Sequence, residues 1–166
     1  SFLFTRYFIS HSIYTLELAK RGELKTHNKD KNVLMLLNID KVLETNFISI
    51  SPDMYLGEIL HKAVAKSSRN NFPVINDKGE FLGVILLDDI RSIMFDEKLY
   101  NKVQVSQLMH SAPDTISYEN DSMEAIMLKF KTSGAWNLPV IKKGKYYGFI
   151  SKSRLLSAYR RKLIDA

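Results

Sequence analysis

Few side chains in this sequence combine a type and a spacing that would suit catalysis or metal binding. Asp88 and Asp89 are adjacent carboxylates that could hold a magnesium ion, but Asp88 is better suited to cap a helix that carries Ile90, Ile93 and Met94. The four histidines are scattered and there is no cysteine, so neither a zinc site nor a catalytic triad is expected. The sequence also has no Gly-x-x-x-x-Gly-Lys phosphate loop and no nucleophile elbow. It therefore predicts a protein that is not an enzyme.

The positive charge of the chain is concentrated in its second part. The net charge is +6, and residues 1–100 contain 13 lysines and arginines against 13 acids, whereas residues 101–166 contain 11 against 5. Most of the excess falls between Lys142 and Lys162. Such a region could meet an anionic ligand, a membrane surface or nucleic acid, and an ordinary solvated face is an equally weighted alternative.

A five-residue phrase occurs twice in the chain. Asn71–Ile75 is Asn-Phe-Pro-Val-Ile, and Asn137–Ile141, 66 residues later, is Asn-Leu-Pro-Val-Ile. Each copy is followed by a polar turn and then by a glycine, Gly83 or Gly148, that opens a second apolar run. One copy alone would indicate only a buried strand, because proline is tolerated at the first residue of a strand. Two copies with matching flanks indicate an internal duplication, and the cleft between the two units is the first place to look for a site.

The hydrophobic periodicity predicts the same β-α-β-β-α order in both copies. In the first copy the expected elements are a strand at 47–50, a helix at 56–64, strands at 73–75 and 81–86, and a last helix that begins at Asp88. In the second copy they are a strand at 115–117, a helix at 123–130, strands at 139–141 and 146–150, and a last helix capped by Ser153. The predicted domains are a linker at 1–43 with a helix from near Asp30, the first repeat at 44–96, a polar link at 97–111 and the second repeat at 112–160.

A nucleic-acid-binding surface is one alternative for the basic region. Lys145–Ile150 resembles the strand motif of RNA-binding sheets, with a basic residue beside aromatic ones. Its counterpart in the first repeat, Glu80–Ile85, has an acid where the lysine would meet phosphate. The glycine and the apolar residues therefore belong to the fold, and we expect no nucleic-acid partner.

Two tandem units with Asn-x-Pro-Val-Ile, Gly-Val-Ile and Gly-Phe-Ile resemble a pair of CBS domains, a Bateman module, over about residues 44–160. The resemblance implies an α/β (α+β) fold of two CBS repeats related by a pseudo-two-fold axis and preceded by a helical linker. It also implies a regulatory module without catalytic residues, metal or obligatory cofactor, in which ATP, ADP or AMP binds between the repeats. In the family the backbone beside the x-Pro-Val phrase contacts the adenine edge, which here corresponds to Asn71, Phe72, Val74, Asn137, Leu138 and Val140.

Neither repeat keeps the whole phosphate and ribose pattern of the family, which is Gly-h-h-(Ser/Thr)-x-x-Asp with h apolar. The first repeat has the acid as Asp89 but Leu86 in the hydroxyl position. The second repeat has the hydroxyl as Ser151 but Arg154 in the acid position. Because a guanidinium at a helix start favours phosphate, phosphate-rich nucleotides are expected to bind there, with Asp89 as the ribose partner. The alternative is that Arg154 points to solvent and that the cleft holds no nucleotide.

The first 45 residues resemble the linker that joins the last membrane helix of ClC-family chloride channels and chloride/proton antiporters to their cytosolic CBS pair. The resemblance rests on His11–Thr15, Leu18–Leu24 and Thr26–Asp30, and it makes Phe2–Ile9 the remnant of that membrane helix. It implies a domain at the cytoplasmic face of the cell membrane that modulates chloride transport, with the membrane domain of the same transporter as its partner. The alternative is a free-standing CBS-pair nucleotide sensor or the regulatory domain of another transporter.

The same family resemblance implies a homodimer, because ClC-family transporters are dimers. Apolar helix faces that commonly self-associate would form the interface. The candidate interface helices are Leu56–Ala65, Ile90–Phe95, Met123–Phe130 and Leu155–Tyr159.

Overall fold

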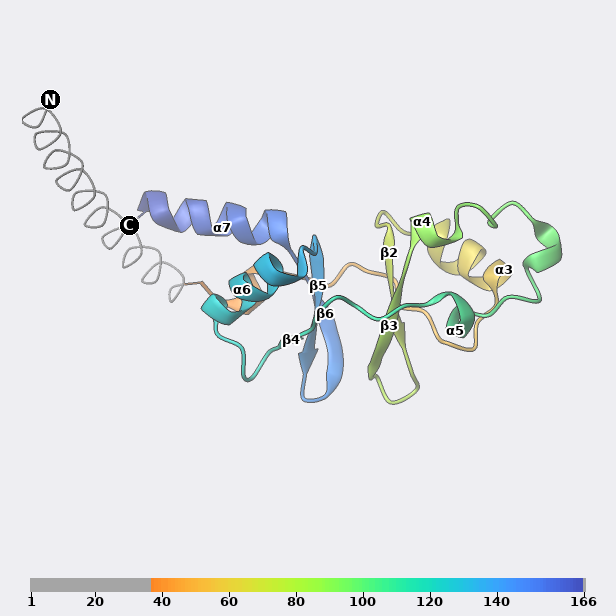
Figure 1. The fold of residues 1–166 in the computed structure, drawn as a ribbon, viewed down its shortest axis with the longest axis horizontal. Coiled ribbons are helices and arrows are strands. Elements are labelled where there is room, and N and C mark those ends of the chain that lie inside the picture. The colour runs from red at the N-terminus through yellow and green to blue at the C-terminus, as the bar shows by residue number, and fades with distance from the viewer. Residues whose placement is uncertain (1–36, 166) are drawn as a thin grey trace, which may run out of the picture.

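The computed structural model describes residues 37–165, and these residues form two small α/β halves that meet through their strands. In Figure 1, β2, β3, β5 and β6 lie in the middle, with α6 and α7 towards one end and α3, α4 and α5 towards the other. The predicted membrane-helix remnant, the ClC-like linker motif and the helix start near Asp30 lie outside the described residues. The described chain enters through α2 (Ile39–Val42), where the Asn38 side chain accepts a hydrogen bond from the amide of Asp40 at 3.0 Å.

The first repeat contains α3 (Leu56–Ile59), a π-helical turn (Leu60–Val64), β2 (Asn71–Ile75), β3 (Phe81–Leu86) and α4 (Leu87–Ile90). β2 and β3 form an antiparallel pair, as predicted. The strand expected at 47–50 is reduced to one bridge, in which Ile50 pairs in parallel with Val74. The last helix begins at Leu87 and ends before most of the predicted interface helix 90–95. The predicted N-cap role of Asp88 is therefore wrong, and its carboxylate instead pairs with Arg91 at 2.9 Å.

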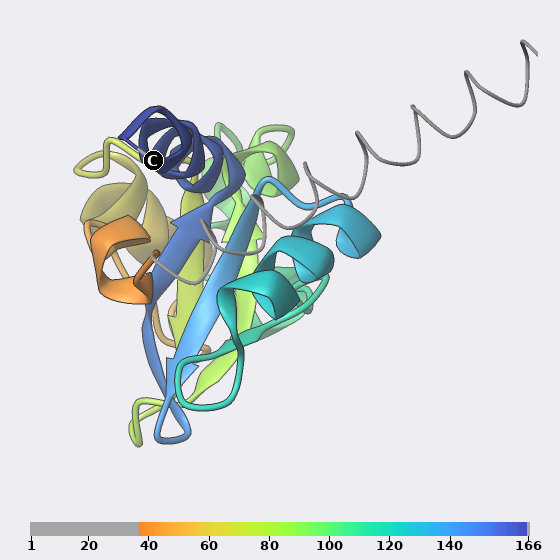
Figure 2. The same cartoon turned by 90° about the vertical axis from the view of Figure 1, so that its left-hand side faces the viewer.

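The second repeat contains β4 (Ile116–Ser117), α6 (Met123–Ser133), β5 (Asn137–Lys142), β6 (Lys145–Ser151) and α7 (Lys152–Asp165). Together with β1 (Leu43–Glu44), its strands form one sheet in the order β1-β6-β5-β4. β4 runs parallel to β5, whereas β5 and β6 form the predicted antiparallel hairpin. Figure 2 shows α6 and α7 on the same side of these strands. The β-α-β-β-α order predicted for this repeat is therefore confirmed.

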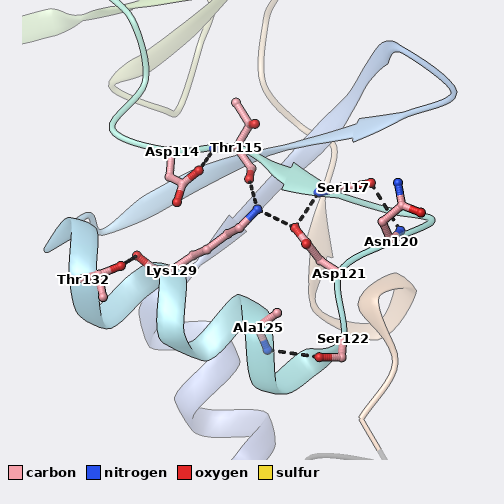
Figure 3. A network of polar contacts seen from close by, with 9 residues as sticks. All are labelled: Asp114, Thr115, Ser117, Asn120, Asp121, Ser122, Ala125, Lys129 and Thr132. Atoms are coloured by element: carbon pink, nitrogen blue, oxygen red, sulfur yellow. Dashed lines mark hydrogen bonds and ion pairs between the residues drawn. The ribbon is translucent and has the colours of Figure 1, made fainter.

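The start of α6 is fixed by the polar network in Figure 3. The hydroxyl of Ser122 accepts a hydrogen bond from the amide of Ala125 at 3.1 Å and caps the helix. One carboxylate oxygen of Asp121 accepts from the amide of Ser117 at 2.8 Å and from Lys129 Nζ at 2.7 Å. Because Ser117 ends β4 and Lys129 lies inside α6, this partly buried carboxylate fastens the helix to the strand.

Each hydrophobic core is completed by the chain segment that precedes the other repeat. Val42, at the end of α2, is fully buried in the core of the second repeat together with Ile126 and Ile150. Val105, in α5 (Val105–Leu108), is fully buried in the core of the first repeat with Leu56. The inter-repeat link, predicted as polar with scattered apolar anchors, has such an anchor in Val105 and also contains a 3-10 turn (Glu97–Leu99) and α5.

The glycine after each Pro-Val phrase lets an extended segment, here called the incoming strand, lie close to the hairpin; it is β1 in the second repeat and the single bridge residue His110 in the first. His110 pairs with Val84 beside Gly83, and Glu44 pairs with Phe149 beside Gly148. A Cβ atom on Gly83 would lie 2.8 Å from the carbonyl oxygen of His110, and one on Gly148 would lie 2.7 Å from that of Glu44. Neither contact leaves room for a side chain. The duplicated glycines therefore place His110 and Glu44 at equivalent positions in the two repeats.

The two hairpins also touch one another. The amide of Tyr146 donates a hydrogen bond to the carbonyl oxygen of Gly79 at 2.9 Å. The rings of Phe81 and Tyr146 stack with their centroids 6.2 Å apart. These contacts close one end of the interface between the repeats.

Candidate functional site

Two cavities lie where the repeats meet. The first cleft, of about 280 Å³, is lined mainly by apolar groups and includes Asn71, Val84, Leu86, His110, Ala112, Pro113, Ala135, Trp136, Asn137, Pro139 and Phe149. The second cleft, of about 520 Å³, is lined by Glu44, Arg69, Trp136, Asn137, Ser151, Ser153, Arg154 and Ser157. Trp136 and Asn137 line both clefts, so the two spaces adjoin at the start of β5.

The second cleft is built around one carboxylate and two guanidinium groups. Oε1 of Glu44 accepts from Nη2 of Arg69 at 3.2 Å and from Nη1 of Arg154 at 3.3 Å. The side chain of Glu44 is 9% exposed, whereas those of Arg69 and Arg154 are 32% and 50% exposed. Arg154 therefore pairs with a carboxylate inside the cleft. From the sequence we expected it either to bind a nucleotide phosphate or to point to solvent, and did not expect this ion pair. Two cations against one anion leave the site with a net positive charge.

The N-terminus of α7 forms one wall of this second cleft. The hydroxyl of Ser151 accepts a hydrogen bond from the amide of Arg154 at 3.2 Å, so Ser151 caps the helix. The prediction that Ser153 is the cap is wrong, because α7 begins one residue before Ser153. The positive end of the helix dipole favours a bound anion at this wall.

An exposed aromatic ring stands at the mouth of the cleft. The Trp136 residue is 73% exposed, which is unusual for so large an apolar group. Nζ of Lys152 lies 5.4 Å from the centre of its ring, and the amide of Lys152 donates to the Trp136 carbonyl oxygen at 2.8 Å. The backbone of Trp136 is therefore held against α7 while its ring offers a face on which a planar base could stack.

The first cleft has a different chemistry. Oδ2 of Asp89 accepts from the amide of Leu86 at 2.8 Å and lies 2.9 Å from Nε2 of His110. The carboxylate thus caps α4 and pairs with the histidine of the incoming strand. Among the described residues that line this cavity there is no lysine or arginine. The first cleft therefore suits an apolar group better than a phosphate.

The residues predicted from the Pro-Val phrase take different places in the structure. Asn71 and Asn137 line the first cleft, at the starts of β2 and β5. The side chains of the other four point into the two cores, where their residues are 0–2% exposed: Phe72, Val74, Leu138 and Val140. These four can contact a ligand only through the backbone, as the resemblance implied.

Sequence reasoning missed Glu44, Arg69, His110 and Trp136. Trp136 is the single tryptophan and directly precedes the second phrase, so its position was a usable signal. Glu44 and His110 could not be found in this way, because β1 and the strand at His110 reach the clefts by pairing with the hairpin of the distant repeat.

Two further observations concern metal binding and membrane insertion. Within residues 37–165 no three or more histidine or acidic side chains are grouped so that they could hold a metal ion. None of the helices in the same range has the length and apolar character that crossing a membrane requires.

The model of the CBS domain family matches residues 39–96 and 105–161. Solved structures with a similar fold include CbpB in complex with c-di-AMP, at 20% identity and a TM-score of 0.65 over 85% of this chain and 96% of that one. The CBS domain of a CBS domain-containing membrane protein from Sphaerobacter thermophilus matches at 17% identity and a TM-score of 0.60, over 83% and 96% of the two chains. Protein MJ1004 from Methanocaldococcus jannaschii matches at 18% identity and a TM-score of 0.62, over 75% of this chain but only 60% of that one.

Identities this low show a shared fold and no more, and no curated protein sequence matches the chain. None of these comparisons links it to the ClC family in particular. The two family matches coincide with the two β-α-β-β-α units, the duplicated phrase and the paired clefts between them. This chain therefore belongs to the CBS domain family and carries two CBS repeats in tandem.

Proposed function

We propose that this CBS pair regulates a larger protein by binding an adenine nucleotide in the second cleft. The observation that carries the proposal is the pair of guanidinium groups, Arg69 and Arg154, that face one cavity beside the exposed ring of Trp136. Planar guanidinium groups bind phosphate oxygens through paired hydrogen bonds, and an indole face accepts a stacked base. A nucleotide supplies both groups.

The charges of the cleft favour nucleotides with more phosphates. Nη2 of Arg69 donates to Glu44 and to Oδ1 of Asn46 at 3.0 Å, and Nη1 of Arg154 donates to the same oxygen of Glu44, so three of the five N–H donors of Arg69 and four of those of Arg154 are not engaged by these bonds. The start of α7 adds the helix dipole on the same side. We therefore expect affinity to fall in the order ATP, ADP, AMP and adenosine. The solved complex of CbpB with c-di-AMP supports the choice of an adenine ligand for this fold.

Thermal unfolding with each of these four ligands tests the proposal. A ligand at one hundred times its dissociation constant adds about 2.7 kcal/mol to the free energy of unfolding, which is a readily measured shift. Arg154→Asp should abolish the shift, whereas Arg160→Ala, which removes an exposed arginine of the same helix outside the cleft, should leave it unchanged. If none of the four moves the midpoint at millimolar concentration, the module acts as a structural or interaction domain.

We further propose that the regulated protein is a ClC-type chloride channel or transporter. The support is the resemblance of residues 11–30 to the linker of that family, together with the match to a CBS domain taken from a membrane protein. The module would then lie at the cytoplasmic face of the cell membrane, with the membrane domain of the same chain as its partner. Chloride flux through vesicles that contain the full-length protein, measured with and without ATP, tests this assignment. A coding sequence that starts near Ser1, without preceding apolar helices, would instead favour a free-standing nucleotide sensor.

A homodimer is part of the same proposal. The groove between α6 and α7 is lined by apolar side chains that include Met127, Leu155 and Leu156, and Leu128 at its edge is 59% exposed. Apolar surface of this kind is commonly covered by a second subunit. Light scattering at tens of micromolar should show a dimer, and Leu128→Asp should convert it to a monomer. A monomeric wild-type protein at that concentration would contradict the prediction.

A further inference from the structure

The side chain of Glu44 connects three separate parts of the chain. It belongs to β1, which directly follows α2 and pairs with β6 of the second repeat. Its Oε1 atom binds Arg69 of the first repeat and Arg154 of the second. A change at this carboxylate would therefore act at once on both repeats and on the segment by which the chain enters the module.

The second oxygen of the same carboxylate is unused. Oε2 of Glu44 is buried, in a residue that is only 9% exposed, and it has no hydrogen-bond partner among residues 37–165. A buried charged oxygen without a donor destabilises the protein, so a partner that brings a donor would be favoured. The atom belongs to a residue that lines the second cleft, so a ligand there that displaces the groups now covering Oε2 can supply that donor.

The neighbours of Oε2 restrict the kind of ligand. Arg69 and Arg154 favour an anionic group, whereas Oε2 favours a hydrogen-bond donor that is not an anion, because the carboxylate would repel a second negative charge. A ligand that satisfies all three side chains carries phosphate and hydroxyl groups a few bonds apart. A ribonucleotide has this arrangement in its sugar and 5′-phosphates.

We propose that Oε2 of Glu44 accepts a hydrogen bond from a ribose hydroxyl of the nucleotide whose phosphates bind Arg69 and Arg154, and that Glu44 transmits this occupancy to β1 and α2. This inference rests on the proposed nucleotide site and assigns its sugar contact. Arg154 of the second repeat occupies the position equivalent to Asp89 of the first. The carboxylate that this position lacks is supplied instead by Glu44 of β1. Asp89, in contrast, already shares one oxygen between Leu86 and His110.

Calorimetric titration with three probes tests the sugar contact: ATP, 2′,3′-dideoxy-ATP and inorganic tripolyphosphate. Wild-type protein should bind ATP about tenfold or more tightly than the dideoxy analogue, since a hydrogen bond to a carboxylate is lost. In Glu44→Gln this preference should fall to about threefold or less, while tripolyphosphate should bind at least as tightly as before, because the competing charge is gone. Glu58→Gln, a change on the surface of the first repeat, should keep the wild-type preference.

Amide hydrogen exchange at residues 42–45 tests the transmission. ATP should slow exchange in β1 of the wild-type protein by severalfold and should have no such effect in Glu44→Gln. If Glu44→Gln does not fold, Glu44→Asp keeps the charge but retracts the oxygens, and it should show the same loss of preference for ATP over the dideoxy analogue.

The possible outcomes separate the inference from the function beneath it. If ATP binds and the preference for ribose hydroxyls survives in both variants, Glu44 is not the sugar contact, although the nucleotide site stands. If ATP binds and hydrogen exchange in β1 does not change, Glu44 does not transmit nucleotide binding to β1 and α2, and that part of the inference is wrong. If neither ATP nor tripolyphosphate binds the wild-type protein, the nucleotide site itself is wrong, and the inference fails with it.

Discussion

The first repeat pairs an acid at its helix start with a base on the incoming strand, and the second repeat does the reverse. Asp89 at α4 lies 2.9 Å from His110, whereas Arg154 at α7 lies 3.3 Å from Glu44. The backbone brings the same two positions together in both repeats, since each incoming strand lies against the corresponding glycine. Which of the two carries the negative charge is decided by the side chains alone. The duplication therefore conserves the contact, while the sequence makes one cleft apolar and the other cationic.

The same contrast appears in how the two helices are capped. In a capping box the N-cap hydroxyl accepts from the N3 amide, and the N3 acid accepts from the N-cap amide. The first repeat keeps the acid half, with Asp89 accepting from the amide of Leu86, and the second keeps the hydroxyl half, with Ser151 accepting from the amide of Arg154. Each helix start is therefore stabilised by one bond of the two. Because the hydroxyl of Ser151 caps the second helix, the position of Arg154 can carry a cation without leaving that helix uncapped.

The largest expected effect comes from closing the space that the glycines keep open. Gly148→Ala would place a Cβ atom 2.7 Å from the backbone oxygen of Glu44, which cannot move away as a flexible side chain could. We expect the free energy of unfolding to fall by about 1–3 kcal/mol, measured from the urea midpoint at constant slope. Gly83→Ala should lower the free energy of unfolding by a similar amount, because its Cβ atom would lie 2.8 Å from the backbone oxygen of His110. A change below about 0.5 kcal/mol in both would show that the strands tolerate displacement, against the argument for a fixed contact.

A smaller effect is expected when the acid position of the second repeat is restored. Arg154→Asp places a second carboxylate beside the buried Glu44 and should lower the free energy of unfolding by about 1–2 kcal/mol, since Arg69 remains and Arg154 is half exposed. Adding Glu44→His recreates the acid–histidine pair of the first repeat and should recover part of the loss, with a coupling of about 0.5 kcal/mol or more in a double-mutant cycle. Additive effects of the two changes would show that the positions do not interact.

The fold could be predicted from the sequence where local pattern and repetition agree. The second phrase lies in a hairpin whose strands are buried in continuous runs, residues 138–140 and 148–150, so the apolar runs themselves indicated β5 and β6. The first strand of the first repeat was overpredicted, because Ile48 and Ile50 suit a strand but only Ile50 meets a partner. Only some of the residues that line the candidate second cleft were named from the sequence. Ser151 and Arg154 were singled out by comparison with the family's Gly-h-h-(Ser/Thr)-x-x-Asp pattern, whereas Glu44 enters the same cleft through a pairing across the whole module that no local signal encodes.

The capping difference gives the next prediction. Ser151→Ala removes the hydroxyl that accepts from the amide of Arg154 and should lower the free energy of unfolding by about 1 kcal/mol. Ser153→Ala is the matched control, because Ser153 is exposed and lies one residue inside α7, and its effect should stay within about 0.5 kcal/mol. Thermal or urea unfolding of both variants compares them directly. A larger loss of stability in Ser153→Ala than in Ser151→Ala would show that Ser153, and not Ser151, caps α7.

The smallest effect concerns the aromatic pair where the hairpins touch, Phe81 in the first repeat and Tyr146 in the second. The hydroxyl of Tyr146 is buried without a hydrogen-bond partner among the described residues, and burial raises the pKa of this phenol. Phe81 occupies the equivalent place without a hydroxyl, and the two rings stack. Tyr146→Phe should therefore raise the free energy of unfolding, by up to about 1 kcal/mol, because it removes an unsatisfied polar group and keeps the ring.

The sign of the pH dependence provides the sharper measurement of this variant. The pKa of Tyr146 is higher in the folded protein, so above about pH 10 the unfolded chain loses the phenol proton while the folded protein retains it. The contribution of this group to stability is present below that pH and is lost as the pH rises further. The advantage of Tyr146→Phe over wild type in urea unfolding should consequently grow between about pH 10 and 11. A constant difference across this range would mean that the hydroxyl of Tyr146 reaches solvent and that the two repeats do not differ in the polarity of their contact.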